Sequence, residues 1–208
     1  MRISELSVRS GVAIPTIKYY LREGLLHPGE QTAATRAEYD DSHLRRLRLI
    51  RTLLDVGRLS VAAIKKVVAA VDDPSLPMHV TLGTAHNALS VPVEPEPGDE
   101  WRAARSQVDA LLDDLGWEVA PAAPTRDELA HTLVRMRQLG LRIDLAPYAE
   151  AARRLVADVE MDAIPFDGPR DAAVEAMVLG TVLYGRALDT LRRMAQESES
   201  ALRVTPAR

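Results

Sequence analysis

The sequence predicts a mostly α-helical protein, and composition, spacing and the positions of Gly and Pro each support this fold class. Apolar residues make up 47% of the 208 residues but aromatic residues only 4%, so the core must consist mainly of Leu, Val, Ile and Ala. Such side chains suit helices packed on helices better than a β-sandwich. Apolar residues recur at spacings of three and four, and Gly and Pro end the resulting segments.

Charge is distributed unevenly along the chain. Residues 1–71 carry a net charge of +5 and residues 72–208 a net charge of −9, within a total of −4. The basic N-terminal part is therefore the part expected to approach a polyanion such as nucleic acid. The chain has no cysteine, which excludes disulfides and thiolate metal sites, and no apolar run approaches the roughly 20 residues that span a membrane. We expect a cytoplasmic protein with no membrane partner.

Two short helices are predicted at the N-terminus. The first covers Ile3–Arg9 and ends at Gly11, because glycine accepts the left-handed conformation that often ends a helix. The second begins near Pro15, since proline suits the first turn of a helix, and it stops at Gly24. A helix, a tight turn and a second helix have the spacing of a helix-turn-helix.

The next segment, Leu25–Glu38, is predicted as a loop or a short two-stranded hairpin. Asp40 then offers an N-cap for a third helix that runs to about Val56, and Ser60 can cap a fourth that runs to Val71. These elements define a predicted first domain, residues 1–73.

The remaining chain is predicted to be helical after a linker at residues 74–98. This linker includes a possible short helix at Met78–Ser90 and three prolines within 91–98. Residues 99–208 are predicted to form an all-helical bundle for dimerisation and effector binding. Its expected helices cover 99–115, a segment opened by a capping box of Thr125 with Glu128, a segment capped by Asp144, and 170–197, whose apolar middle should lie centrally.

An ordered series of motifs spans the first third of the chain. It comprises Ile3-Ser4-Glu5-Leu6, Gly11-Val12, Thr16-Ile17-Lys18-Tyr19-Tyr20, Glu23-Gly24-Leu25, Tyr39-Asp40-Asp41, Leu44-Arg45-Arg46-Leu47, Val56-Gly57 and Leu59-Ser60 followed by Ile64. This series resembles the start of MerR-family regulators. The resemblance implies a winged helix-turn-helix that binds double-stranded promoter DNA as a homodimer, with RNA polymerase as a possible further partner.

The second predicted helix carries the main candidates for DNA contact. A recognition helix must present polar and basic groups outward while its apolar side anchors it. Lys18 and Arg22 are four residues apart and share a face, although without the surrounding motif they would be an ordinary solvated surface. The full set of predicted DNA-binding residues is Arg9, Pro15, Thr16, Lys18, Tyr19, Arg22 and Arg36, the last within the expected wing.

Two further features of this region concern the cap of the second helix and a group of arginines. Position 13 is Ala, where the family often places a hydroxyl cap, so one cap hydrogen bond should be missing. The arginines at positions 45, 46, 48 and 51 either contact phosphates or face solvent and the acidic side chains of neighbouring helices.

Apolar residues of the segment 99–115 follow a heptad pattern. Its predicted dimerisation residues are Trp101, Val108, Leu111 and Leu115. This helix either forms a coiled coil with a second chain or packs within the C-terminal bundle.

Four aromatic residues are candidates for a ligand pocket: Trp117, Tyr148, Phe166 and Tyr184. Scattered aromatics also serve as core residues, so both interpretations remain. His79 and His86 could share a helical face, but they lack the pattern of a metal site, and we expect neither metal nor cofactor.

The sequence therefore predicts a dimeric, sequence-specific transcription regulator, and our hypothesis is that a small apolar or cationic organic ligand in the C-terminal domain switches it. By the resemblance, it bends and untwists over-spaced promoter DNA. The alternative is a ligand-independent DNA-architectural protein whose helical domain docks a protein partner. We find no nucleophile–base pair, phosphate loop or metal triad, so an enzyme is not expected.

Overall fold

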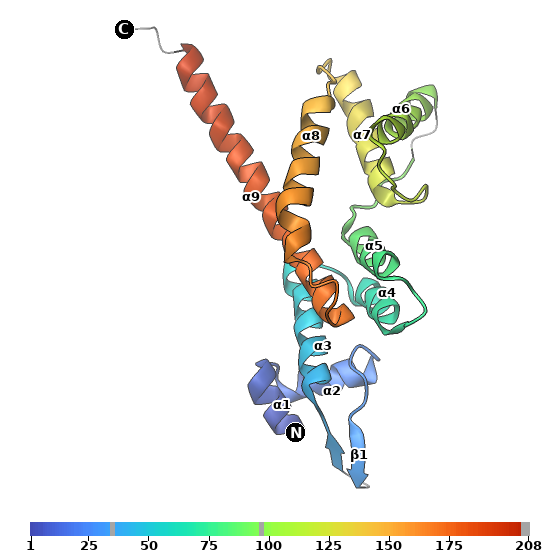
Figure 1. Ribbon diagram of the computed structural model, residues 1–208, viewed down its shortest axis with the longest axis vertical. Coiled ribbons are helices and arrows are strands. Elements are labelled where there is room, and N and C mark those ends of the chain that lie inside the picture. Colours follow the sequence, from blue (N-terminus) through green and yellow to red (C-terminus); the bar gives the residue numbers. More distant parts are fainter. Residues whose placement is uncertain (34–35, 96–97, 205–208) are drawn as a thin grey trace.

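A computed structural model describes residues 1–33, 36–95 and 98–204 (Figure 1). Most of these residues are helical, and the described residues form one two-stranded sheet, which confirms the predicted fold class. The short N-terminal helices and the sheet gather at one end of an elongated molecule, and the long C-terminal helix, Arg170–Val204, runs to the other end (Figure 1). Across the described residues, no helix is both long enough and apolar enough to cross a membrane.

The first two helices form the expected helix-turn-helix. Helix α1 (Ile3–Ser10) ends at Gly11, whose φ of 67° lies in the left-handed region. Helix α2 (Ile14–Arg22) has Pro15 in its first turn, as predicted. Its N-cap residue, Ala13, makes no side-chain hydrogen bond, so the expected loss of one cap bond is also confirmed.

The segment after α2 forms a hairpin, which decides between the two predicted alternatives. Strand β1 (Glu30–Ala33) pairs antiparallel with strand β2 (Arg36–Glu38). A Cβ atom on Gly29 would come within 2.5 Å of the Glu38 carbonyl oxygen, so the close approach of the strands requires glycine. This hairpin occupies the place of the predicted wing.

The third and fourth helices have clear caps. Helix α3 (Asp41–Arg51) starts after Asp40, whose side chain accepts hydrogen bonds from backbone N–H groups of the first turn. A π-helical segment, η1 (Thr52–Val56), continues α3. Helix α4 (Val61–Asp72) is capped by Ser60, whose Oγ accepts from the Ala63 N–H at 3.2 Å.

A single apolar core, here called the N-terminal core, combines side chains from residues 6–85 with side chains from residues 164–178. Helix α5 (Met78–Leu89) confirms the possible short helix and contributes Ala85 to this core. The C-terminal part of the chain adds Ile164, Val174, Met177 and Val178 to the same core. This packing differs from the predicted domain limits, because residues on both sides of the expected linker share one core.

A second, smaller core belongs to helices α6 (Asp99–Leu115) and α7 (Pro124–Gln138), here called the α6–α7 pair. Helix α7 begins at Pro124, and its N-cap residue, Ala123, makes no side-chain hydrogen bond. The predicted capping box of Thr125 with Glu128 is therefore wrong, because Thr125 already lies inside the helix.

The last elements are α8 (Ala146–Leu155), the π-helical segment η2 (Val156–Glu160), the short helix η3 (Met161–Ala163) and α9 (Arg170–Val204). Helix α8 and helix α9 diverge from a common region, and α9 runs on to the far end of the molecule (Figure 1). The first turns of α9 are buried, whereas the turns after Val178 are mostly exposed. The prediction that the apolar middle of this helix lies centrally in a bundle is therefore wrong.

Candidate nucleic-acid interface

The outward face of α2 presents the main basic side chains of the predicted interface. Lys18 and Arg22 are exposed, while Ile17 and Tyr20 on the opposite side anchor the helix in the N-terminal core. The Arg22 guanidinium carbon lies 5.4 Å from the centroid of the Tyr19 ring. This cation–π contact favours a defined orientation of Arg22 over a freely mobile one. The recognition helix thus has the required two-sided character.

The other predicted contacts surround this face. Pro15 and Thr16 belong to the first turn of α2. Arg9 lies in the last turn of α1, and its Nη2 lies 3.2 Å from Asp41 Oδ1 in an exposed ion pair. Such an exposed pair contributes little stability, so a phosphate could compete for this arginine. Arg36 begins β2, but its side chain lies outside the described part of the structure.

A cluster of polar residues joins the hairpin to α3. The rings of His27 and His43 are 3.9 Å apart between centroids, and His43 Nδ1 lies 2.8 Å from Asp40 Oδ1. Burial, with His43 nearby, lowers the pKa of His27. Hydrogen bonds from Ser42 and His43 lower the pKa of Asp40. The ligand atoms of His27, Asp40 and His43 lie within 4.8 Å of one another, close enough to hold a metal ion, but hydrogen bonds already engage these groups at the N-cap. The cluster therefore fixes the base of the wing.

Arg46 is buried, at 4% exposure of its side chain, so this side chain is not available to contact a phosphate. Its Nε donates to Asp171 Oδ2 at 2.9 Å, and its Nη1 donates to Asp72 Oδ2 at 3.0 Å. Of the two alternatives that the sequence left open for this arginine, the structure supports contact with acidic side chains of neighbouring helices rather than contact with phosphate. No local sequence signal reveals the bond, because Asp171 lies 125 residues away.

Arg170 makes a second connection between α9 and the N-terminal helices. Its Nη1 donates to the Asp73 carbonyl oxygen at 2.7 Å and to Thr81 Oγ1 at 3.1 Å. Arg46 and Arg170 together join the start of α9 to α3, to the end of α4 and to α5. The position of α9 is thereby linked to the position of the recognition helix.

The heptad residues of α6 mostly pack within the chain. Trp101 and Val108, at 9% and 1% exposure, are buried in the core of the α6–α7 pair, and Leu111 and Leu115 are half-buried. The prediction that Trp101 and Val108 form a dimer seam needs correction, because α7 already covers these two side chains.

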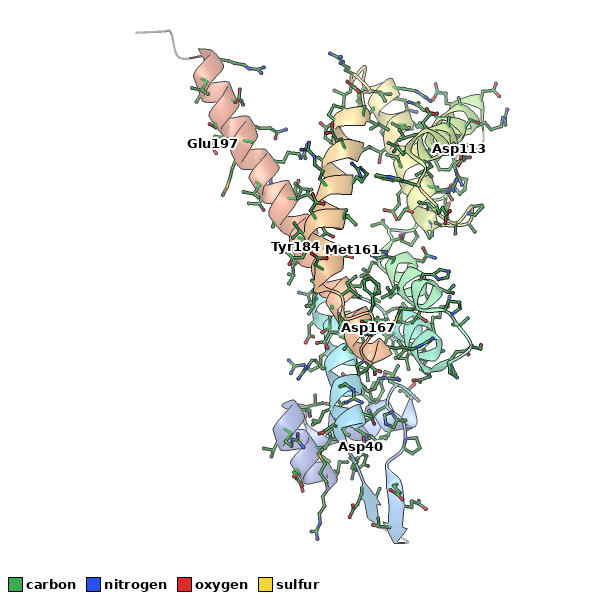
Figure 2. The ribbon with its side chains drawn as sticks, viewed as in Figure 1. Asp40, Asp113, Met161, Asp167, Tyr184 and Glu197 are labelled. Carbon is green, nitrogen blue, oxygen red and sulfur yellow. The ribbon has the colours of Figure 1, made fainter. Side chains whose placement is uncertain are left out.

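Helix α9 instead carries an uncovered apolar stripe. Leu188 and Leu191 are 48% and 62% exposed, and the stripe extends to Tyr184 and Leu202. The spacings from 184 to 188 to 191 are those of a heptad seam, and Leu202 falls in the same register. Figure 2 shows Tyr184 near the point where α8 and α9 diverge and Glu197 far along the projecting part of α9.

The four predicted pocket aromatics do not come together. Tyr148, Phe166 and Tyr184 are exposed on three different segments, and Trp117 packs against the core of the α6–α7 pair. A cavity of about 830 Å3 lies elsewhere, between α5, the segment 118–128 and Thr181 of α9, and none of the four aromatics lines it. Its lining includes His79 and His86, which the sequence pattern did not identify as ligand-binding residues.

A basic recognition helix, a helix-turn-helix and a hairpin in the place of a wing define a helix-turn-helix DNA-binding domain. The family model for MerR HTH family regulatory proteins matches residues 1–71. A solved structure described as the "putative transcriptional regulator SCO5550 from Streptomyces coelicolor A3(2)" is 42% identical, with a TM-score of 0.76 and 98% of each chain covered. The chain therefore belongs to the MerR family.

Curated relatives match mainly through the N-terminal domain. The chain is 40% identical over 75 residues to the HTH-type transcriptional regulator HmrR of Sinorhizobium medicae (strain WSM419), which covers 36% of this chain and 50% of that protein. It is 27% identical over 118 residues to the HTH-type transcriptional regulator MerD of Shigella flexneri, which covers 57% of this chain and 91% of that protein. The chain thus spans about half the length of the first curated relatives that it matches.

Proposed function

We propose that the protein is a dimeric, sequence-specific transcription regulator that binds promoter DNA and catalyses no reaction. The exposed basic face of α2, displayed by a MerR-type helix-turn-helix, is the observation that carries this proposal. Lys18 and Arg22 can neutralise phosphates or recognise guanine, and Tyr19 can donate to a phosphate oxygen. The similarity to a proposed transcriptional regulator over 98% of the chain supports the same function.

Dimerisation through α9 follows from its uncovered stripe. A long projecting helix with an exposed apolar seam is unfavourable alone, whereas a second copy would bury Leu188 and Leu191. Arg192 and Glu199 flank the seam seven residues apart. An antiparallel pair that crosses between them brings Arg192 of one copy beside Glu199 of the other. Opposite charges at this crossing favour a second copy of this chain as the occupant.

The exposed apolar side chains of α8 and η2 extend the proposed interface. Tyr148, Leu155 and Val159 are seven and four residues apart, so they share one face of this continuous helical segment. Helices α8 and α9 diverge from a common region (Figure 1), and in this proposal the second copy contacts the exposed apolar side chains of both. Two paired DNA-binding domains also supply the phosphate contacts that one helix-turn-helix lacks.

A ligand-switched regulator is favoured over the ligand-independent, DNA-architectural alternative. The cavity of about 830 Å3 has the size of a site for a small organic molecule. Because Thr181 of α9 lines this cavity, a bound ligand can influence how the two DNA-binding domains are held, and through them the promoter and RNA polymerase.

The test is a fluorescence-anisotropy titration of the protein against its own promoter region at two salt concentrations. Lys18→Ala and Arg22→Ala are each expected to weaken binding by about 1 kcal/mol or more and to reduce the salt dependence. The matched control is Arg142→Ala, which removes an exposed arginine from the segment between α7 and α8. Equal binding by all four proteins would contradict the assignment of the recognition helix.

A further inference from the structure

The cavity described above lies where two separately packed parts of the molecule meet. One wall is α5, with His79, Gly83 and His86, which belongs to the side of the N-terminal core. The opposite wall is the segment from Glu118 to Glu128 at the start of α7. Among the described residues, α6 and α7 pack extensively only on each other. A molecule in this cavity therefore contacts two parts that otherwise share few contacts.

The lining has an unbalanced negative charge. It includes the carboxylates Glu118 and Glu128, and none of the described lining residues is a lysine or an arginine. Neither carboxylate forms an ion pair with a described residue. Desolvation by the surrounding protein lowers the pKa of His86, which disfavours the charged form of its imidazole. The lining therefore favours a positively charged occupant.

Glu128 also lacks a hydrogen-bond donor. Its Oε1 atom is buried and accepts no hydrogen bond from the described residues. A buried carboxylate oxygen without a donor is unfavourable, and an N–H group with a positive charge is the strongest donor for it.

The same cavity offers apolar contacts for the body of a ligand. Val80 and Leu89 of α5 face it from one side, and Val119, Ala120 and Ala123 from the other. A metal ion fits less well, because among the described residues the metal-ligand spacing occurs at His27, Asp40 and His43 instead.

We propose that this cavity binds an organic cation, an amine on an apolar body, with Glu128 as its principal counter-charge and Glu118 as the second. The proposal rests on the proposed function in one respect, namely that this amine is the effector of the regulator. Binding holds the α6–α7 pair against α5 and α9. The ligand also meets the junction of α5 and α9, where His86 Nε2 and Thr181 Oγ1 lie 2.9 Å apart.

The test compares three probes with one apolar body and different charges: 1-naphthylmethylamine, 1-naphthalenemethanol and 1-naphthoate. Each is titrated into the DNA-free full-length protein by isothermal titration calorimetry at pH 7. The amine is expected to bind at least about tenfold more tightly than the alcohol and the carboxylate. Because DNA is absent, failure of this test is separate from failure to bind a promoter.

Three variants locate the site. Glu128→Gln is expected to weaken amine binding by about tenfold or more. Asp113→Asn on α6 (Figure 2) removes an exposed carboxylate outside the cavity and should leave the affinity unchanged. Gly83→Leu should abolish binding by filling the cavity, and it should fold, because an added Cβ there meets nothing within 4 Å. No detectable binding of the amine, equal affinity for all three probes, or full affinity in Glu128→Gln or Gly83→Leu would overturn the proposal.

Discussion

The two halves of α9 have opposite surroundings. In the first half, Ala173, Val174, Met177 and Val178 are buried in the N-terminal core, and Asp171 bonds to the buried Arg46. In the second half, apolar residues from Leu183 onward are exposed, and the ion pairs among the described residues, such as that of Arg193 with Asp189, lie within the helix itself.

The two halves of α9 therefore have different roles. The first half fixes α9 to the DNA-binding domain, and the second half presents a surface for another molecule. Since a helix transmits position along its length, the geometry of the proposed dimer sets the separation of the two recognition helices. We call the buried first half of α9 the anchor and its exposed second half the interface, and separate variants change one or the other.

The largest effect is expected at the anchor. Arg46→Met leaves the carboxylate of Asp171, which is 19% exposed, without its partner and should reduce the free energy of unfolding by about 3 kcal/mol. Arg193→Met, the matched change in the second half, breaks an exposed ion pair with Asp189 and exposed hydrogen bonds to Asp189 and Thr190, and should cost less than about 1 kcal/mol. Urea unfolding at one fixed protein concentration measures both. Equal losses in the two variants would show that the two halves do not differ as described.

A smaller, pH-dependent effect is expected at Glu175 in the anchored half. Burial raises the pKa of this carboxyl, and Arg48 and the hydrogen bond from Thr52 offset this only in part. A carboxyl whose pKa is higher in the folded state favours folding below its unfolded pKa, and that contribution is lost as pH rises through the folded pKa. The free energy of unfolding of Glu175→Gln should therefore exceed that of the original protein by up to about 1 kcal/mol at pH 8, and the two should not differ in this way at pH 4.

The control for this pH dependence is Glu197→Gln in the exposed half, at a position outside the proposed seam. It should change the free energy of unfolding by less than about 0.5 kcal/mol at either pH. Urea titrations at pH 4 and pH 8 provide the comparison. A Glu175→Gln difference that is the same at both values would contradict the assigned burial.

Local signals predict the DNA-binding end of the fold well. Gly11, Pro15 and Ser60 act on the turns where they occur, so the helix limits around them follow from the sequence. The candidate contacts Lys18 and Arg22 are exposed for the same reason, because the 3.6-residue period opposes them to Ile17 and Tyr20.

The helical remainder could not be predicted in the same way, because a pattern identifies an apolar face but not the surface that covers it. The heptads of α6 are covered by α7, whereas those of α9 are uncovered. The bond between Arg46 and Asp171 and the cavity at Glu128 both join segments that are far apart in the sequence. Only the assembled fold brings such residues together.

The most direct test of the two-part helix is the oligomeric state of interface variants. Sedimentation equilibrium would compare the original protein with the double variant Leu188→Glu and Leu191→Glu. Ser200→Glu is the matched control, since it adds an acidic side chain on the face of α9 opposite the stripe. Urea unfolding of the double variant checks that its N-terminal core is intact.

We expect the original protein and Ser200→Glu to sediment as dimers. We expect the double variant to sediment as a folded monomer with weaker promoter binding. A monomeric original protein, or a double variant that remains dimeric, would contradict the assignment of α9 as the dimer helix.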